Sequence, residues 1–510
     1  MCGIAGFCNF NENFEENTDY WNFRLEKMRA VLAHRGNDAR GRFLKKHIGL
    51  SHSRLAIRDI LCGDQPMTRT HNGYDYTICY NGEIYNTDEL IPELSENGFV
   101  CSTTSDTEVI LYAYIHWGAD FVSRLNGIFA FAIWDAAKNK LLLYRDRVGV
   151  KPLFYAIRGD SLVFGSEPKA CFAHPAVKPE LDKQGLQELL AIGPAHTSGL
   201  SLFKDLFEVL PGHFMIYSKD GLHDETYWEL TSREHTDSYQ DTVAHTRFLV
   251  EDAIKRQMVS DVPVCTFLSG GIDSSIVTAI AANYMNTRGK TLNTFSFDFK
   301  DNDRYFKANA FQPERDLPYV NRMLEEYETA HSYLECDENA LFKALFAAVD
   351  AKDMPGMTDV DSSLLYFCSL VSLKNKVALT GECADEIFGG YPWFYRKELL
   401  ERYGFPWSSD VAPRLALLRD DVALELDLSG YQAFRYEESR SKAPLLYGET
   451  GEDESRRVIG YLNIKWFMQT LLDRMDRTSM YSELEARVPF ADHRIIEYVF
   501  NVPWHMKYQN

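Results

Sequence analysis

The sequence has no long apolar run, and no stretch approaches 18 consecutive apolar residues, so a membrane-spanning helix is not expected. It starts Met1-Cys2-Gly3, with no basic segment followed by an apolar one, so no secretory leader is expected either. None of the 10 cysteines forms a CxxC pair, which disfavours a zinc or disulfide framework and indicates free thiols in the cytoplasm. Basic residues number 54 against 74 acidic, a net charge of −20, so neither nucleic acid nor an anionic membrane is an expected partner.

The length of 510 residues, with 45% hydrophobic residues, predicts about two to four domains with large cores. The first domain, 1–205, is predicted to be an α+β layered domain, because short β-rich runs alternate with turn clusters. Its expected strands are 77–80, 128–134, 140–145, 152–157 and 161–164, and its expected helices are 23–32 and 107–117. A connecting segment is expected at 206–242. From 243 to 510, helical runs alternate with buried strands, which predicts an α/β open, mostly parallel sheet with a helical C-terminal part.

The stretch FLSGGIDSS at 267–275 has the pattern of a phosphate-binding turn between a strand and a helix. Its glycines, Gly270 and Gly271, allow backbone N–H groups to approach a ligand at the helix N-terminus, where the peptide dipoles favour an anion. Further donors are the hydroxyl groups of Ser269, Ser274 and Ser275. The alternative is an ordinary glycine-rich turn capped by Asp273.

Asp273 would repel a phosphate unless a divalent cation lay between them, so the stretch predicts Mg²⁺ as well as a nucleotide. A second motif, TGECADEIFGGY at 380–391, has three carboxylates within five residues after a predicted strand. Carboxylates this close are unfavourable unless they share a cation, a proton or a basic partner. Asp385 is therefore predicted to join Asp273 on Mg²⁺, which leaves Glu382 as a general base. The alternative places these carboxylates on the solvated first turn of a helix.

Cys2 is the candidate nucleophile of the first half. If Met1 is removed, Cys2 carries both a thiol and an α-amine, whose pKa of about 8 makes it a proton acceptor for its own side chain. A thiolate attacking an amide also needs donors for the developing oxyanion, and Asn81-Gly82 offers a side-chain amide and a backbone N–H. The alternatives are a small buried thiol in an edge strand and, for Asn81-Gly82, a hairpin turn.

Several segments of the first half resemble the glutaminase domain of the class II glutamine amidotransferases, which has an N-terminal nucleophile hydrolase-type fold. These segments are Cys2-Gly3-Ile4, His34-Arg35-Gly36, RLAI at 54–57, YNGEIYN at 80–86 and SDTE at 105–108. The resemblance implies that Cys2 is the nucleophile and that Asn81 and Gly82 form the oxyanion hole. It also implies a set of glutamine-binding residues with charges that suit the substrate. They are Arg54 for the carboxylate, and Glu83 and Asp106 for the ammonium group.

The second half resembles the ATP-pyrophosphatase synthetase domain of glutamine-dependent asparagine synthetases. The resemblance rests on 267–275, 380–391 and EARVPFADH at 485–493. It implies that a carboxylate attacks the α-phosphate of ATP, that pyrophosphate leaves on Mg²⁺, and that ammonia channelled from the Cys2 site displaces AMP. Glu382 would deprotonate the attacking ammonia. The implied nucleotide contacts are Leu268, Ser269, Gly270, Gly271, Asp273, Ser274, Ser275, Phe297, Thr380, Gly381 and Asp385.

The sequence also departs from that family. Where the family often has Thr-Thr/Ile-Arg near its aspartate pocket, this sequence has PGMTDVDSS at 355–363, and 299–319 looks like an insertion. Asn37 replaces a usual Pro, and the sequence stops at Asn510, before the Lys-x-x-Leu-Arg helix of the family, so we expect the C-terminal end to be missing here. Three readings stay open: asparagine synthesis, amidation of another acid such as a diaminopimelate-type cell-wall precursor, and a non-catalytic amidotransferase-like binding protein. The resemblance also allows a homodimer.

Overall fold

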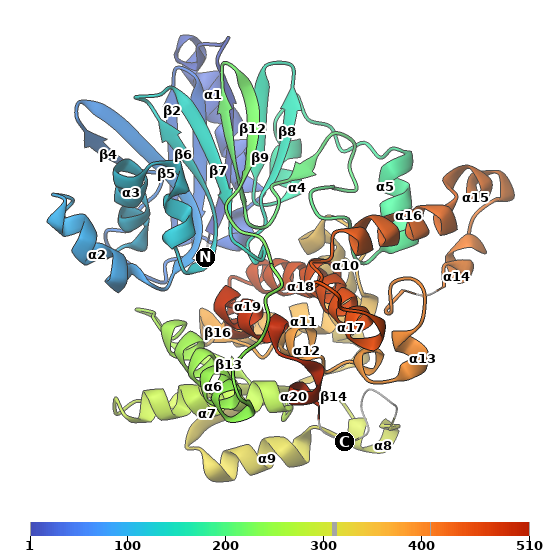
Figure 1. Ribbon diagram of the computed structural model, residues 1–510. Coiled ribbons are helices and arrows are strands. Elements are labelled where there is room, and N and C mark those ends of the chain that lie inside the picture. Colours follow the sequence, from blue (N-terminus) through green and yellow to red (C-terminus); the bar gives the residue numbers. More distant parts are fainter. Residues whose placement is uncertain (1, 309–313, 409, 509–510) are drawn as a thin grey trace.

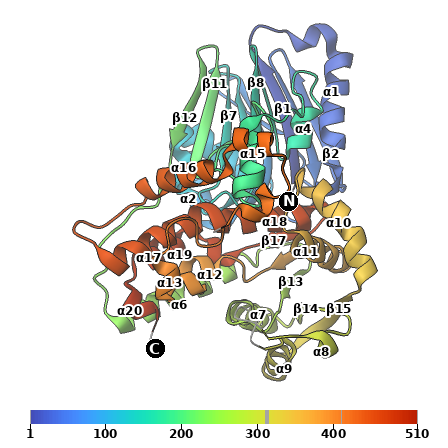
Figure 2. The same ribbon diagram turned by 90° about the vertical axis from the view of Figure 1, so that its right-hand side faces the viewer.

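The computed structural model describes residues 2–308, 314–408 and 410–508 (Figure 1). Two sheets stand at the top of Figure 1, and the C-terminal half with most of the helices lies below them, as the turned view in Figure 2 also shows. Met1, Asn510 and residues 309–313 of the predicted insertion lie outside the described residues. Within the described chain, no helix combines the length and the apolar character needed to cross a membrane.

The first two sheets are antiparallel, each with six strands among the described residues. In order, the first sheet contains β10 (Phe207–Glu208), β8 (Phe154–Arg158), β9 (Ser161–Gly165), β1 (Cys2–Asn9), β3 (Ile48–Arg54) and β2 (Ala39–Lys45). The second contains β12 (Gly221–Thr226), β11 (His213–Ser218), β7 (Lys140–Arg145), β6 (Gly127–Asp135), β5 (Tyr74–Ile84) and β4 (Met67–His71). Each strand predicted for this half is present among them.

These sheets pack face to face, with helices on both outer sides. The outer helices are α1 (Thr18–Ala30) and α4 (Pro168–Phe172) on the first sheet, and α2 (Thr87–Glu96) and α3 (Asp106–Trp117) on the second. Strand β1 shows why: Ile4 and Cys8 join the core between the sheets, whereas Ala5 and Phe7 face α1. The layered α+β fold is confirmed. Since β1 lies between β9 and β3, the alternative that placed Cys2 in an edge strand is wrong.

Strands of the N-terminal sheets continue into the predicted connection at 206–242. β10 pairs with β8, and β11 pairs with both β7 and β12. The longest stretch of the connection without helix or strand is 227–238, and α6 (Tyr239–Arg256) follows it. The polar composition of the connection was visible in the sequence, but the strands before it were not.

The C-terminal half is built on a parallel sheet, as predicted. In order it contains β15 (Thr329–Cys336), β14 (Leu292–Phe299), β13 (Val264–Phe267), β16 (Val377–Leu379) and β17 (Glu485–Arg487). One face packs on α6, α7 (Ile272–Asn286) and α19 (His493–Asn501), and the other on α11 (Thr358–Val371). The chain leaves β13 toward β14 and returns on its other side at β16. Ligands of such sheets lie at this switch point, at the carboxyl ends of the strands.

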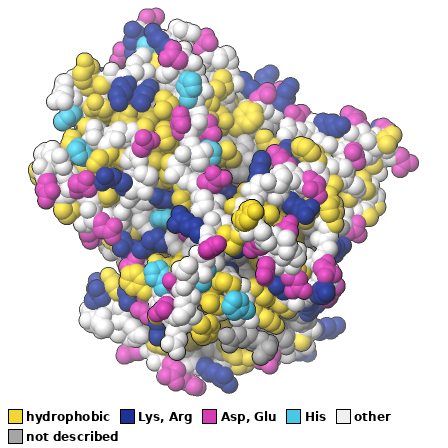
Figure 3. Space-filling model, viewed as in Figure 1, with side chains coloured by type: hydrophobic (Ala, Val, Ile, Leu, Met, Phe, Trp, Pro, Cys, Tyr) yellow, Lys and Arg dark blue, Asp and Glu magenta, His cyan; other side chains and the backbone are white. Residues whose placement is uncertain are grey.

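Among the described residues, two hydrophobic clusters join the halves. One contains Leu55 of the first half and Ile254 of the second. In the other, Ala191 and Ile192 of the first half pack with Phe405, Leu462 and Trp466 of the second. On the face shown in Figure 3, Asp and Glu side chains are spread over both halves, with basic side chains among them. The cluster around Ala191 and Ile192 contains no strand residue, so it joins the halves at a place away from the sheets.

Candidate active sites

The predicted glutaminase residues come together at the end of β1 that faces the C-terminal half. Cys2, Arg54, Gly82, Glu83 and Asp106 line one cavity of about 30 Å³. They project from β1, β3, β5 and the first turn of α3, and Cys2 stands directly opposite Arg54 in the β1–β3 register. The antiparallel pairing thus gathers residues that are far apart in the sequence.

Asn81 lies beside Cys2 and has a donor to spare. The Cys2 backbone N–H donates to Asn81 Oδ1 over 2.9 Å, while Asn81 Nδ2 is buried and has no hydrogen-bond partner in the described part of the chain. Buried polar groups are normally paired, so Asn81 keeps an unused donor beside Cys2. At Gly82 a Cβ atom would lie 2.2 Å from the Ile128 carbonyl oxygen, so only glycine fits there.

The segment that carries Asn81 is fixed by its neighbours. Gln65 Oε1 accepts from the Tyr80 backbone N–H at 2.6 Å, and Asp106 accepts from the Tyr80 hydroxyl at 2.8 Å. His52 contacts the Tyr80 carbonyl through Nε2 at 3.1 Å, and because burial lowers the pKa of His52 to about 3, the ring is neutral and donates there. These supports were not identified from the sequence.

Arg54 is held by the loop at 58–64. Its guanidinium donates to the carbonyl oxygens of Asp59 at 2.6 Å and Ile60 at 3.2 Å, and pairs with the exposed carboxylate of Asp64 at 3.0 Å. A cavity of about 30 Å³ accommodates roughly one water molecule. The space beside Arg54 in this structure is therefore smaller than an amino acid.

Glu83 also has partners already. It pairs with Arg58 at 3.1 Å and with Arg487 of β17, in the other half of the chain, at 3.4 Å. Burial and the nearby charge of Asp106 raise the pKa of Glu83, and the two arginines oppose that rise. Burial likewise raises the pKa of the Cys2 thiol, so the thiol needs a base before it can attack.

Arg35 ties Cys2 to the second half. Its guanidinium donates to the Cys2 carbonyl oxygen at 3.0 Å, and it pairs with Glu167 at 2.9 Å and Asp476 at 2.8 Å. Lys151 also pairs with Asp476, at 2.9 Å. A fully buried ion-pair network therefore spans the boundary next to Cys2.

The two motifs of the second half meet around one cavity of about 420 Å³. A Cβ atom at Gly381 would lie 2.8 Å from Ser274 N and 3.0 Å from Asp273 Cβ, so the second motif packs directly on the start of α7. Both motifs follow carboxyl ends of neighbouring strands, β13 and β16, which is why they meet. The predicted residues that line the cavity are Ser269, Gly271, Asp273, Ser274, Thr380, Gly381, Glu382 and Asp385.

Four of the predicted nucleotide contacts lie elsewhere. Phe297 lines a neighbouring cavity of about 410 Å³, which shares Ser269 with the first. Leu268 is 1% exposed, and its N–H donates to the Phe295 carbonyl. Gly270, with φ of +85°, forms the turn before α7, and Ser275 lies in the first turn of that helix. Neither these two residues nor Leu268 line the 420 Å³ cavity.

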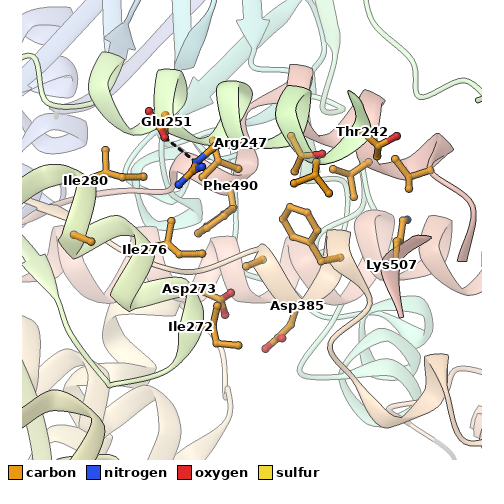
Figure 4. A pocket seen from close by; sticks show the side chains of 18 of the residues that line it. Thr242, Arg247, Glu251, Ile272, Asp273, Ile276, Ile280, Asp385, Phe490 and Lys507 are labelled. Carbon is orange, nitrogen blue, oxygen red and sulfur yellow. Dashed lines mark ion pairs between the residues drawn. The ribbon is translucent and has the colours of Figure 1, made fainter. Parts of the chain in front are cut away.

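Asp273 and Asp385 project into the same space from α7 and α12 (Ala384–Phe388), at the edge of a larger hollow of about 990 Å³ (Figure 4). Burial and then the charge of Asp385 raise the pKa of Asp273 to about 6. Burial and the charge of Glu382 raise the pKa of Asp385 as well. The described residues contain no group of three or more His, Cys, Asp or Glu side chains placed to hold a metal. Two repelling carboxylates still fit Mg²⁺, which commonly takes one or two protein carboxylates and shares substrate phosphates.

The sequence predicted that Glu382 would be free of partners, but in the structure it has one. Arg474 of α18 (Met468–Tyr481) donates to it at 2.9 Å, and Arg474 Nε is buried without a partner in the described part of the chain. Arg474 was missed, although a charged run at 473–477 in a largely buried helix was a usable signal. Glu382 is therefore one half of an ion pair that lines the cavity.

Known proteins resemble this chain over its whole length. The family described as "Glutamine amidotransferase domain" matches residues 1–228, and the one described as "Asparagine synthase" matches residues 245–510. Asparagine synthetase [glutamine-hydrolyzing] 3 of Bacillus subtilis (strain 168) is 49% identical over 508 residues, covering 99% of this chain and 82% of that protein. The chain belongs to the glutamine-hydrolysing asparagine synthetase family. The family resemblance drawn from the motifs is thereby confirmed.

More distant relatives bear other names as well. Asparagine synthetase [glutamine-hydrolyzing] 1 of the same Bacillus strain is 29% identical, covering 100% of this chain and 82% of the relative. Amidase chyE of Penicillium rubens is also 29% identical, covering 99% and 83%. The stretch 355–363, which departs from the family pattern, adds no carboxylate to the cavity. Asp361 is buried, pairs with Lys352 at 3.5 Å and accepts from the Met357 N–H, while Asp359 is exposed. Of that stretch, only Met357 lines the 420 Å³ cavity.

Proposed function

We propose that this protein makes L-asparagine and L-glutamate from L-aspartate, L-glutamine, ATP and water, releasing AMP and diphosphate. The observation that carries the proposal is the presence of two separate cavities in one molecule. One is lined by Cys2 and Gly82, and the other by Asp273 and Glu382. Family membership adds support for ATP as co-substrate and for small molecules as partners.

In the first cavity, the Cys2 thiolate attacks the side-chain carbonyl carbon of glutamine. The α-amine of Cys2, once Met1 is removed, accepts the thiol proton, and Asn81 Nδ2 with the Gly82 N–H holds the oxyanion. The C–N bond breaks as the α-ammonium of Cys2 passes that proton to the leaving nitrogen, which departs as ammonia, and water then hydrolyses the thioester to glutamate. Arg54 would bind the substrate carboxylate, and Glu83 with Asp106 would bind its ammonium group.

In the second cavity, the aspartate side-chain carboxylate attacks the α-phosphorus of ATP, and the bond to the β-phosphate breaks. The N-terminal end of α7, with Ser269, Gly271 and Ser274, binds the leaving diphosphate. Mg²⁺, when bound by Asp273 and Asp385, would neutralise the phosphate charge. Ammonia that crosses from the first cavity attacks the activated carbonyl, Glu382 takes a proton, and AMP leaves.

Aspartate is the acceptor that this proposal names. The stretch 355–363 suggested a different acceptor because it contains additional carboxylates. In the structure, however, Asp361 is paired with Lys352, and Asp359 is exposed to solvent. That departure therefore does not make the cavity more acidic. The non-catalytic reading also loses support, because both cavities contain the groups that the chemistry needs.

The test is a product assay with purified protein, glutamine, ATP and Mg²⁺. AMP, diphosphate and the amidated product are measured with aspartate, with diaminopimelate, and with no acceptor. We expect AMP and asparagine to form in equal amounts only with aspartate. AMP formation that depends on diaminopimelate but not on aspartate would contradict the acceptor, and no AMP with either would contradict the synthetase reaction.

The division of the chain is also proposed. We place the amidotransferase domain at 2–226, the link at 227–238 and the synthetase domain from 239 onward, because strands of the first sheets reach Thr226. The ten cysteines are all unpaired in the described chain, which suits a reducing cytoplasm and a reactive thiol at position 2. A homodimer rests on the family resemblance alone, and the mass in solution would test it.

A further inference from the structure

Arg487 touches both reaction centres, and no role has been assigned to it so far. Its carbonyl oxygen accepts from the Thr380 backbone N–H at 3.0 Å and from the Thr380 hydroxyl at 3.3 Å, beside the nucleotide cavity. Its guanidinium lies 3.4 Å from a carboxylate oxygen of Glu83, in the glutamine cavity. One residue thus spans the boundary between the two sites.

The position of β17 explains this arrangement. It pairs with β16, whose end leads into the 380–391 motif, and its other side is turned to the amidotransferase half. Because side chains alternate along a strand, Glu485 and Arg487 project to the same side. Glu485 lines the glutamine cavity together with Cys2, and Arg487 Nε donates to Glu485 at 2.5 Å. A synthetase strand therefore forms a wall of the glutamine cavity.

The guanidinium of Arg487 is fully buried and has four hydrogen-bond acceptors. Besides Glu485 and Glu83, it donates to the carbonyl oxygens of Gln257 at 2.6 Å and Val259 at 2.5 Å. A planar fork with five N–H groups can serve these acceptors together, whereas a lysine ammonium with three donors cannot. The geometry is specific to arginine.

The segment 257–261, which supplies these two carbonyl groups, also contacts the chain on either side of Arg58. Asp261 N donates to the Ile57 carbonyl at 3.0 Å, and Asp59 N donates to the Asp261 carboxylate at 2.8 Å. These residues flank Arg58, the second partner of Glu83. Both cations on Glu83 are therefore placed by contacts with the segment that precedes β13.

We propose that Arg487 is a positioning residue shared by the two sites, which orients Glu83 for the ammonium group of glutamine from the synthetase side. The inference rests on the proposed function, since it takes Glu83 as a glutamine ligand. It gives the arginine of the 485–493 motif a role that its sequence position alone does not reveal. It also means that the amidotransferase half by itself has an incomplete glutamine site.

The test uses Arg487→Lys in the full chain. Glutamate release is measured over a range of glutamine concentrations, and asparagine synthesis is measured with ammonium in place of glutamine. We expect the KM for glutamine to rise about tenfold, because Glu83 loses a hydrogen-bonded cation, and kcat to change less than about threefold. Ammonium-driven synthesis should fall by less than about threefold, because lysine keeps the backbone carbonyl that contacts Thr380.

Arg494→Lys is the matched control, since Arg494 pairs with Asp252 and Asp492 and lines neither cavity. It should leave the KM for glutamine unchanged. An unchanged KM in Arg487→Lys, or an equal loss of both activities, would overturn the inference. Should that variant not fold, Arg487→Gln decides on the same two readouts: an unchanged KM overturns the inference, and a raised KM with retained ammonium-driven synthesis supports it. Absence of glutamate release by the wild-type protein would instead overturn the proposed function itself.

Discussion

The Cys2 backbone N–H donates to the side-chain oxygen of Asn81 over 2.9 Å, although the two residues belong to different sheets. The same amide bears the buried Nδ2 group that has no partner in the described residues. The proposed nucleophile and the proposed oxyanion donor are thus fixed relative to each other before any substrate binds. Such preorganisation is what stabilises a developing negative charge effectively.

Replacement of Cys2 by Ala should lower glutamine-dependent synthesis by at least about a thousandfold, because no other group can form the thioester. Synthesis from added ammonium should continue, since the second cavity contains no part of Cys2. Glutamate release and asparagine formation are measured side by side. Cys101→Ala, which removes a partly buried cysteine that lines neither cavity, is the control. Loss of ammonium-driven synthesis in Cys2→Ala would show that the sites are not independent.

Asn81→Ala should lower kcat for glutamate release by about 100- to 1,000-fold, the usual effect of deleting one oxyanion donor. The KM for glutamine should change much less, because the interaction is made in the transition state. Steady-state kinetics of glutamate release separate the two parameters. Asn97→Ala, on the exposed end of α2, should behave as the wild-type protein does. A change confined to KM would argue against this role for Asn81.

Asp273→Asn should reduce AMP formation by at least about 100-fold with either nitrogen source, because the carboxylate pair can no longer hold Mg²⁺ at the phosphates. Glutamate release should fall less than about threefold, and chelation of Mg²⁺ should reproduce the loss in the wild-type protein. AMP and diphosphate are quantified with glutamine and then with ammonium. Asp359→Asn, an exposed aspartate at the start of α11, serves as the control. AMP formation that persists in Asp273→Asn would contradict the metal assignment.

The His196–Glu208 pair, 2.9 Å apart, should make the free energy of unfolding fall as the pH rises into the alkaline range. Burial lowers the pKa of His196, but the charge of Glu208 outweighs it and raises that pKa to about 9. A raised histidine pKa means that the stabilisation is complete below the ordinary value of about 6.5 and is lost as the pH rises through 9. His196→Gln should therefore lose about 1–2 kcal/mol at pH 7 and much less at pH 10.

Urea unfolding midpoints at pH 7 and pH 10 check this prediction. His223→Gln, which alters an exposed histidine, is the control and should show no comparable pH dependence. A difference between wild type and His196→Gln that stays constant from pH 7 to pH 10 would exclude the ion pair as its source.

Much of the fold and of both sites was predictable from local signals. The turn at 267–275 and the motif at 380–391 each follow a short apolar strand, and parallel strands bring their carboxyl ends together, so the contact of Gly381 with Asp273 follows from sequence order. The β-rich runs of the first half were likewise visible as alternating patterns. Cys2 was identified because its position and chemistry are unusual together.

The remainder depends on contacts between segments that no local pattern connects. Glu83 pairs with Arg487, 404 residues away, and Glu382 pairs with Arg474, 92 residues away. β1 is buried on both faces because α1 and the second sheet cover it, and its small residues gave no alternating signal. Burial that is set by tertiary packing decides these cases, and periodicity does not report it.

The shared cluster of Ala191, Ile192, Phe405, Leu462 and Trp466 has a practical consequence for the polypeptide. A protease that nicks the chain between 227 and 238 would cut the covalent link without separating the fragments. The two pieces would still migrate as one particle, because the apolar cluster and the buried Arg35–Asp476 pair join them independently of the peptide bond. Co-expression of the pieces as separate chains should then rebuild a working enzyme.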